Sequence, residues 1–158
     1  MTTTPEQRLA QLGLVLPPVT LPRGNFDAWV LDGSMLYLSG KGWPMRADAE
    51  AVPKVGRDMS LEEARGHAHE VGLHLIATMK HALGELSRVR RVVKLLGMVN
   101  AVPDFTGHTE VINGCSDLMV AVFCVAGRHA LQAIGVAALP RRVAVELAAS
   151  VSVMRDAN

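Results

Sequence analysis

The segment Val143–Val153 alternates strictly between two kinds of side chain. Every second position is apolar, and the positions between carry small residues and one charge, Glu146. A period of two predicts a β-strand with one face directed to the core. Because the other face is small and nearly uncharged, we expect it to lie against another protein surface. Glu146 would then occupy a partly dry place lined by more than one subunit.

Composition narrows the class of protein. The chain has 158 residues, 49% of them hydrophobic, and a formal net charge of +1. This length suits one domain with its own core, and the low charge argues against a nucleic-acid partner. The N-terminus has no basic region followed by an apolar run, and no uninterrupted apolar stretch reaches membrane-spanning length. We therefore expect a cytoplasmic protein with no membrane partner.

Local signals predict the element order β-β-α-β-α-β-β after a short N-terminal helix. Ser60 followed by Glu63 is a capping-box pairing that begins a long helix, and the segment from Gly40 to Met59 is expected to be a loop. The other expected elements are a helix over Pro5–Leu12, strands over Phe26–Leu31, Met35–Ser39 and Val89–Val99, a helix over Thr109–Ala126, and strands over Ala133–Ala138 and Val143–Val153.

These elements define an α+β fold with two helices on one face of a mixed sheet. Two helices cover only one face of a sheet of about five strands, so the other face needs a partner. Self-association is the simplest way to supply that cover. We assign residues 1–24 to an N-terminal helix with a Pro-rich connector, and residues 25–158 to a single domain.

Three sequence motifs resemble those of the RidA/YjgF family. They are Leu31–Gly40 (LDGSMLYLSG), Val111–Gly114 (VING) and Ile134–Glu146 (IGVAALPRRVAVE). The resemblance runs from about Phe26 to Val153 and looks closest to an uncharacterised bacterial branch. It implies a chorismate-mutase-like fold, a homotrimer whose sheets form a barrel, and small-molecule clefts between subunits. Many family members hydrolyse reactive imines or enamines.

The resemblance also assigns site residues. The family's cleft glutamate, six residues after a proline, falls on Glu146, and its Ser-Gly pair falls on Ser39 and Gly40. Its asparagine matches Asn113, and an aromatic residue near the first strand is matched loosely by Phe26. We expect Glu146 to orient or deprotonate a water molecule, as a partly desolvated carboxylate can.

The family's carboxylate-binding arginine is absent. Its position, nine residues before Pro140, holds Leu131. Arg128 is offset by three residues and should point to the opposite face of its strand, whereas Arg142 lies roughly 13 Å along the strand from Glu146. Neither fits without a bulge or a contribution from a neighbouring subunit, so whether Arg128 or Arg142 replaces the arginine stays open. With Leu131 in the cleft, we expect a ligand that is less anionic or more apolar than an imino acid.

No cofactor or metal is expected. His67, His74 and His81 recur every seven residues, which separates neighbours by about 10.5 Å along a helix, too far to share a metal ion. Two functions of different classes remain: a hydrolase of an imine, enamine or related carbonyl compound, and a non-catalytic ligand-sensing or partner-binding trimer. A weaker third is an endoribonuclease using Arg88, Arg90 and Lys94, against which stand the net charge and only 4% aromatic residues.

Overall fold

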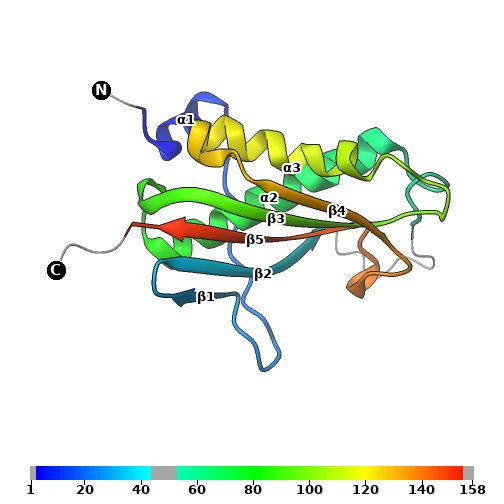
Figure 1. Ribbon diagram of the computed structural model, residues 1–158, viewed down its shortest axis with the longest axis horizontal. Coiled ribbons are helices and arrows are strands. Elements are labelled where there is room, and N and C mark those ends of the chain that lie inside the picture. The colour runs from blue at the N-terminus through cyan, green and yellow to red at the C-terminus, as the bar shows by residue number, and fades with distance from the viewer. Residues whose placement is uncertain (1–2, 44–52, 155–158) are drawn as a thin grey trace.

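The computed structural model describes residues 3–43 and 53–154 as one five-stranded sheet covered on one face by helices (Figure 1). The α+β architecture and the element order expected from the sequence are confirmed. The elements are α1 (Pro5–Gln11), β1 (Trp29–Asp32), β2 (Met35–Trp43), α2 (Leu61–Leu83), β3 (Val89–Asn100), α3 (His108–Phe123), β4 (Ala130–Val136) and β5 (Val145–Val153), with short 3-10 turns at Leu86–Arg88, Cys124–Gly127 and Pro140–Arg142.

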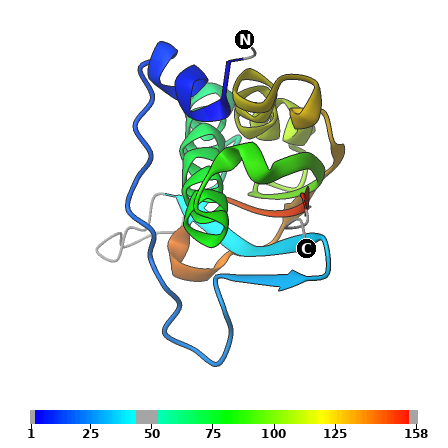
Figure 2. The ribbon, with the colours of Figure 1, turned by 90° about the vertical axis from the view of Figure 1, so that its left-hand side faces the viewer.

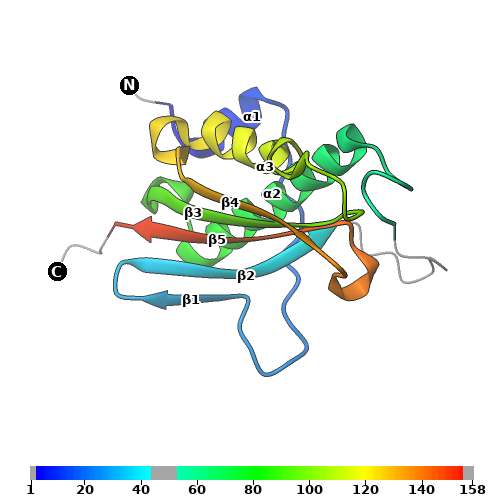
Figure 3. The same ribbon diagram turned by 45° about the vertical axis from the view of Figure 1, so that its right-hand side comes forward.

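The sheet is mixed, with the order β1-β2-β5-β3-β4 (Figure 3). Only β3 and β4 run parallel, and the other neighbours are antiparallel. The last strand in sequence, β5, therefore lies at the centre. Its residues alternate between buried positions that face the helices and half-buried positions on the open face. The alternation predicted from the sequence is confirmed, and Glu146 lies on the open face.

Local capping signals set where the long helices begin and end. At the start of α2 the Ser60 side chain accepts a hydrogen bond from the Glu63 backbone at 3.2 Å, and the Glu63 carboxylate accepts one from the Ser60 backbone at 2.8 Å. Gly84 ends the helix with φ of 81°. On α3, a side chain at Gly114 would collide with the Arg65 backbone, so glycine allows α2 and α3 to pack closely.

Several element boundaries differ from the sequence-based prediction. β1 begins at Trp29 instead of Phe26, and β5 begins at Val145 instead of Val143. β2 continues to Trp43, although Gly40 was expected to begin a loop; residues 44–52 of that loop lie outside the described residues. α3 ends at Phe123 instead of Ala126, because Cys124 adopts φ of 53° and the chain turns into a 3-10 segment. β4 begins at Ala130 instead of Ala133, because it pairs with β3 from Lys94 onward.

α3 packs beside α2 and contacts β3 and β4, and its composition alone would suit a membrane. Within the described residues, His108–Gly127 is the one helical stretch long and apolar enough to span a bilayer, and half of its most apolar window is buried inside the fold. Val111, Ile112 and Cys115 are fully buried in the core that α3 shares with α2 and the strands. The apolar character of α3 is therefore explained by packing within this domain.

The N-terminal helix α1 is hydrogen-bonded to the end of α3 and to the 3-10 turn that follows α2. Leu9 is buried, the Arg8 side chain donates to the Val122 carbonyl, and the Glu6 carboxylate accepts from the Leu86 backbone at 2.7 Å. From α1 a connector runs beside α2 toward β1 (Figure 2). Leu14 and Leu16 of this connector pack against the core. The proposed domain boundary after residue 24 stays a prediction.

Candidate functional site

A β-bulge in β2 creates the local geometry of the candidate site. Leu38 pairs with Ala149 and Lys41 pairs with Leu147, so Ser39 and Gly40 together stand opposite the single residue between those partners. The Ser39 side chain donates to the Asp27 carbonyl at 2.6 Å, and its backbone donates to the Ala28 carbonyl at 3.1 Å. These bonds hold the bulge against the chain entering β1, whose own pairing with β2 stops at Leu38.

Beyond the bulge, the end of β2 borders a cavity of about 400 Å³. Four parts of the chain form its walls: the connector, the end of β2, one face of α2, and the turn before β5. The lining residues are Val19, Thr20, Leu21, Pro22, Phe26, Ser39, Gly40, Lys41, Gly42, Trp43, His74, Thr78, Pro140, Arg141, Val143 and Glu146. A cavity of this size can hold a small organic metabolite.

The Glu146 carboxyl group packs directly on Gly40. A Cβ atom added to Gly40 would lie 3.2 Å from Cδ of Glu146 and would overlap its Oε1 atom. Glycine at this position leaves room for the carboxyl group to lie across the backbone of β2. Burial raises the pKa of Glu146, which favours its protonated form.

Two basic groups approach the cavity from the helix side of β2. Lys41 pairs with Leu147 and thus shares the face that β5 turns to the helices. Its Nζ donates to the Thr20 carbonyl at 3.4 Å, and burial lowers its pKa. The His74 ring lies 5.3 Å from the Trp43 ring. Burial lowers the pKa of His74, Glu70 opposes this shift, and Lys41 adds to it.

Burial therefore shifts Glu146, Lys41 and His74 toward their uncharged forms. Glu146 is the acid, and Lys41 and His74 are the bases. Perturbed ionisable groups gathered in one cavity are typical of functional sites. This convergence distinguishes the cavity from the other described groove, which is more open and lies between α2, α3 and the end of α1, near Leu12, Arg65 and Asp117.

The turn before β5 brings a third basic residue to the cavity. Arg141 lines it, whereas Arg128 and Arg142, the two candidates left open by the sequence, are not among its lining residues. Arg141 and Arg142 have consecutive φ values of 54° and 58°, a left-handed conformation that costs roughly 1–2 kcal/mol per non-glycine residue.

Four of the six site residues proposed from the sequence come together. Phe26, Ser39, Gly40 and Glu146 all line the cavity. Asn113 lies within α3 and does not line it. Leu131 pairs with buried Leu95 and packs against the core, on the helix side of the sheet. A role for Asn113 or Leu131 in a cleft stays a prediction that would involve a neighbouring chain.

Sequence reasoning missed Lys41, His74 and Arg141 as site residues. The sequence placed Lys41 in an expected loop, His74 was considered as a metal ligand and excluded, and Arg141 was not considered. One signal was available for Lys41, because it directly follows the Ser39-Gly40 pair. Among residues 3–43 and 53–154, no group of three or more His, Cys, Asp or Glu side chains could hold a metal ion.

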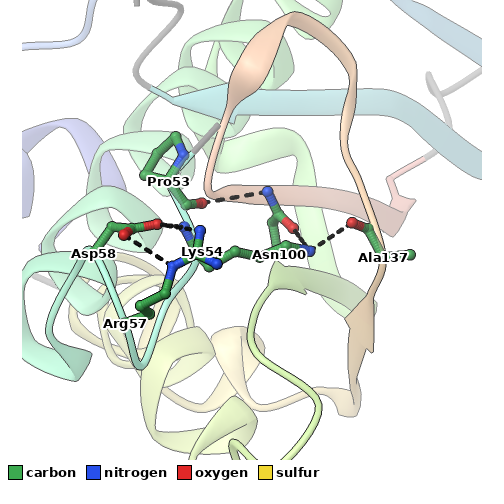
Figure 4. A network of polar contacts seen from close by, with 6 residues as sticks. All are labelled: Pro53, Lys54, Arg57, Asp58, Asn100 and Ala137. Atoms are coloured by element: carbon green, nitrogen blue, oxygen red, sulfur yellow. Dashed lines mark hydrogen bonds and ion pairs between the residues drawn. The ribbon is translucent and has the colours of Figure 1, made fainter. Parts of the chain in front are cut away.

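A polar network connects several chain segments at the end of the sheet where this cavity lies (Figure 4). Lys54 Nζ donates to the Asn100 side chain and to the Ala137 carbonyl, both at 2.5 Å, and Asn100 Nδ2 donates to the Pro53 carbonyl at 3.3 Å. Asn100 is fully buried, and its backbone donates to the Ala144 carbonyl at 2.9 Å. The network thus fixes the chain immediately before β5 and its glutamate.

The fold and the carboxylate-bearing cavity beside the bulge define a chorismate-mutase-like α+β protein. A family model described as "YjgF/chorismate mutase-like, putative endoribonuclease" matches residues 6–147, and the chain belongs to this family. The chain is 39% identical over 144 residues to Protein TCP17 of Trypanosoma cruzi, a match covering 90% of each chain.

Solved structures agree with this assignment. The protein Atu1372 of Agrobacterium tumefaciens, described as having unknown function, superposes with a TM-score of 0.85 at 37% identity, covering 95% of this chain and 92% of the other. A protein of Shewanella oneidensis described as a "putative endoribonuclease" superposes with a TM-score of 0.88 at 29% identity, covering 95% and 99%. The resemblance to the RidA/YjgF family inferred from the motifs is thus confirmed.

Proposed function

We propose that this chain is a cytoplasmic hydrolase of small reactive imines, enamines or related carbonyl compounds, acting as a homotrimer with a cleft at each subunit junction. One observation supports this above the others. The Glu146 carboxyl group, held across Gly40, is an ionisable group in a cavity on a sheet face that is otherwise small and neutral along β5.

Hydrolysis of a C=N bond needs a proton acceptor and then a proton donor. Water must lose a proton as it adds to the carbon, and the departing nitrogen must gain one. A carboxyl group whose pKa is raised toward neutrality can perform both steps. Because burial raises the pKa of Glu146, this residue suits both roles.

The basic lining residues modify the expected ligand. The absence of arginine at Leu131 led us to expect a less anionic ligand, but Lys41 and Arg141 line the cavity of the same chain. An anionic group such as a carboxylate would be attracted to the guanidinium group of Arg141, since burial shifts Lys41 toward its uncharged form. We therefore propose a substrate that carries both a C=N or C=O group and a negative charge.

The open sheet face supports the proposed assembly. Ala148 and Ser150 of β5 lie on it, and Tyr37 of β2 and Ile134 of β4 are 46% and 38% exposed. Small and apolar side chains at the centre of a sheet face are typical of surfaces buried between subunits. A neighbouring chain seated there would lie close to Glu146.

The test is ammonia release from freshly generated 2-iminobutyrate. We expect the wild-type protein to accelerate release and Glu146→Gln to lose at least about a hundredfold in rate, as general acid–base catalysis contributes that much. Glu110→Gln, which changes an exposed glutamate on α3, is the matched control and should keep the wild-type rate. A wild-type rate equal to that in buffer contradicts the hydrolase proposal.

Two alternatives have distinct outcomes. A non-catalytic ligand-sensing or partner-binding trimer would bind 2-oxobutyrate in calorimetry without releasing ammonia from the imine. An endoribonuclease, the activity for which the Shewanella protein is named, would cleave RNA after extensive purification. Register shifts in β3 pair Arg91 with Ser152 and Lys94 with Ser150 of β5, so Arg91 and Lys94 share the open face of the sheet. The sequence had instead suggested Arg88, Arg90 and Lys94 as the basic set. Loss of cleavage on neutralising Arg91 and Lys94 would support that function.

A further inference from the structure

Lys41 is the one lysine among the described residues that line the cavity. Neither the family resemblance nor the proposed role of Glu146 uses its amine. We propose that Lys41 Nζ forms a covalent imine with the carbonyl or imine carbon of the ligand. This inference rests on the proposed function, since it supplies a route for the same hydrolysis.

The bulge places Lys41 and Glu146 around the same end of β2. Glu146 crosses the open face at Gly40, and the next residue, Lys41, projects on the helix side. Pairing of β2 with β1 stops at Leu38. Beyond this residue, the edge of β2 that would face β1 borders the cavity. A small ligand at this edge can contact an amine from one side and a carboxyl group from the other.

The surroundings of Lys41 favour a free amine. Its hydrogen-bond partner is the neutral Thr20 carbonyl, at the long distance of 3.4 Å. Burial lowers the pKa of Lys41, which increases the fraction of uncharged amine at neutral pH. A lysine whose pKa is lowered by partial burial can form a Schiff base with a carbonyl compound.

The proposed reaction exchanges one imine for another. The Nζ lone pair bonds to the substrate imine carbon while the C=N π pair moves to the substrate nitrogen. After proton transfer to that nitrogen, ammonia leaves with the electrons of its C–N bond, and an imine to Lys41 remains. Water then adds to this carbon, the C–N bond to Lys41 breaks, and the carbonyl product is released. The sum is imine plus water to carbonyl plus ammonia, with Glu146 donating and accepting the protons.

Reductive trapping tests this step on the full-length protein. The protein is incubated with 2-oxobutyrate and sodium cyanoborohydride, and peptides are mapped by mass spectrometry. The chain has four lysines, so each is an internal comparison. We expect the secondary amine adduct at Lys41 to exceed that at exposed Lys80 and Lys94 severalfold, because burial lowers the pKa of Lys41 and so raises its share of free amine.

Matched variants sharpen the result. Lys41→Arg should remove the dominant adduct, and Lys80→Arg on the exposed side of α2 should leave it unchanged. Equal labelling of Lys41, Lys80 and Lys94 in the unaltered protein overturns the inference, whether or not any variant folds. So does an unchanged rate of ammonia release in folded Lys41→Arg, a result that leaves the hydrolase proposal standing. Selective trapping without ammonia release would instead retain the covalent step and contradict the hydrolase.

Discussion

At the scale of single residues, Gly40 and Glu146 depend on each other. The carboxyl group of Glu146 occupies the volume that a side chain at position 40 would need. We expect Gly40→Ala to displace this group and to lower kcat/KM for imine hydrolysis by about tenfold or more. The unfolding free energy should change little, because the displaced atoms are the flexible end of a side chain.

A double-mutant cycle measures this dependence. If Gly40→Ala acts by moving the carboxyl group, it should lower the residual rate of Glu146→Gln far less than it lowers the wild-type rate. Equal factors in the two backgrounds would show that Gly40 affects activity through some other contact.

The raised pKa of Glu146 also predicts a pH-dependent cost in stability. Below the ordinary glutamate pKa of 4.5, the carboxyl group is protonated in both the folded and the unfolded chain. As the pH rises through the higher folded-state pKa, the unfolded chain ionises more readily, so stability falls. Glu146→Gln lacks this loss, and its unfolding free energy relative to wild type should increase between pH 4 and pH 7.5.

Urea unfolding at the two pH values checks this expectation at one fixed protein concentration, since assembly would contribute to stability. Glu110→Gln, on the exposed surface of α3, is the control for general charge effects. A relative stability of Glu146→Gln that decreases with pH would contradict burial as the dominant influence on this group.

At the scale of elements, two helical glycines should respond in opposite ways to alanine. Gly66 on α2 has no heavy atom within 4 Å of an added Cβ, so Gly66→Ala should raise the unfolding free energy by up to about 1 kcal/mol through helix propensity. Gly114 on α3 faces the Arg65 backbone, with the carbonyl carbon 3.0 Å from an added Cβ. Gly114→Ala should lower the unfolding free energy by about 1–3 kcal/mol.

Both values come from urea unfolding at neutral pH. The comparison separates helix propensity from helix packing, because each change adds the same methyl group to a helix. A stabilising effect of Gly114→Ala would mean that α2 and α3 can move apart without loss.

Local sequence signals predicted the order of the elements, but they did not predict where β2 ends. Capping residues such as Ser60 and the alternation around Glu146 act over a few positions, so they can be recognised from the sequence alone. Gly40, Lys41 and Gly42 have low strand propensity, and only pairing with β5 extends β2 through them. Local patterns do not show such long-range pairing.

The same limit explains which site residues were missed. Glu146 was identified from its motif and its small, neutral surroundings. The face on which Lys41 lies depends on the extra residue at the bulge, and the contact of His74 with Trp43 depends on how α2 crosses the sheet. These placements are products of tertiary packing.

At the scale of the whole molecule, the uncovered sheet face makes assembly testable. We expect light scattering to give a particle of three times the 16.9 kDa chain mass at micromolar concentration. Ala148→Arg would place a charge at the centre of the open face and should yield single folded chains, because burying an unpaired guanidinium is costly.

Ala121→Arg, on an exposed position of α3, is the matched control and should remain trimeric. Single chains of the unaltered protein at these concentrations would remove the subunit junction from the proposal. Ammonia release by such single chains would then assign the chemistry to the cavity of one chain alone.

The connector between α1 and β1 has a consequence for how ligand preference can change. It forms the outer wall of the cavity near Thr20, yet it contributes no strand to the sheet. Substitutions there can alter which molecules fit without disturbing the pairing that determines folding. Natural variation in ligand choice should therefore concentrate at residues 19–22 of this stretch, which line the cavity and pair with no strand.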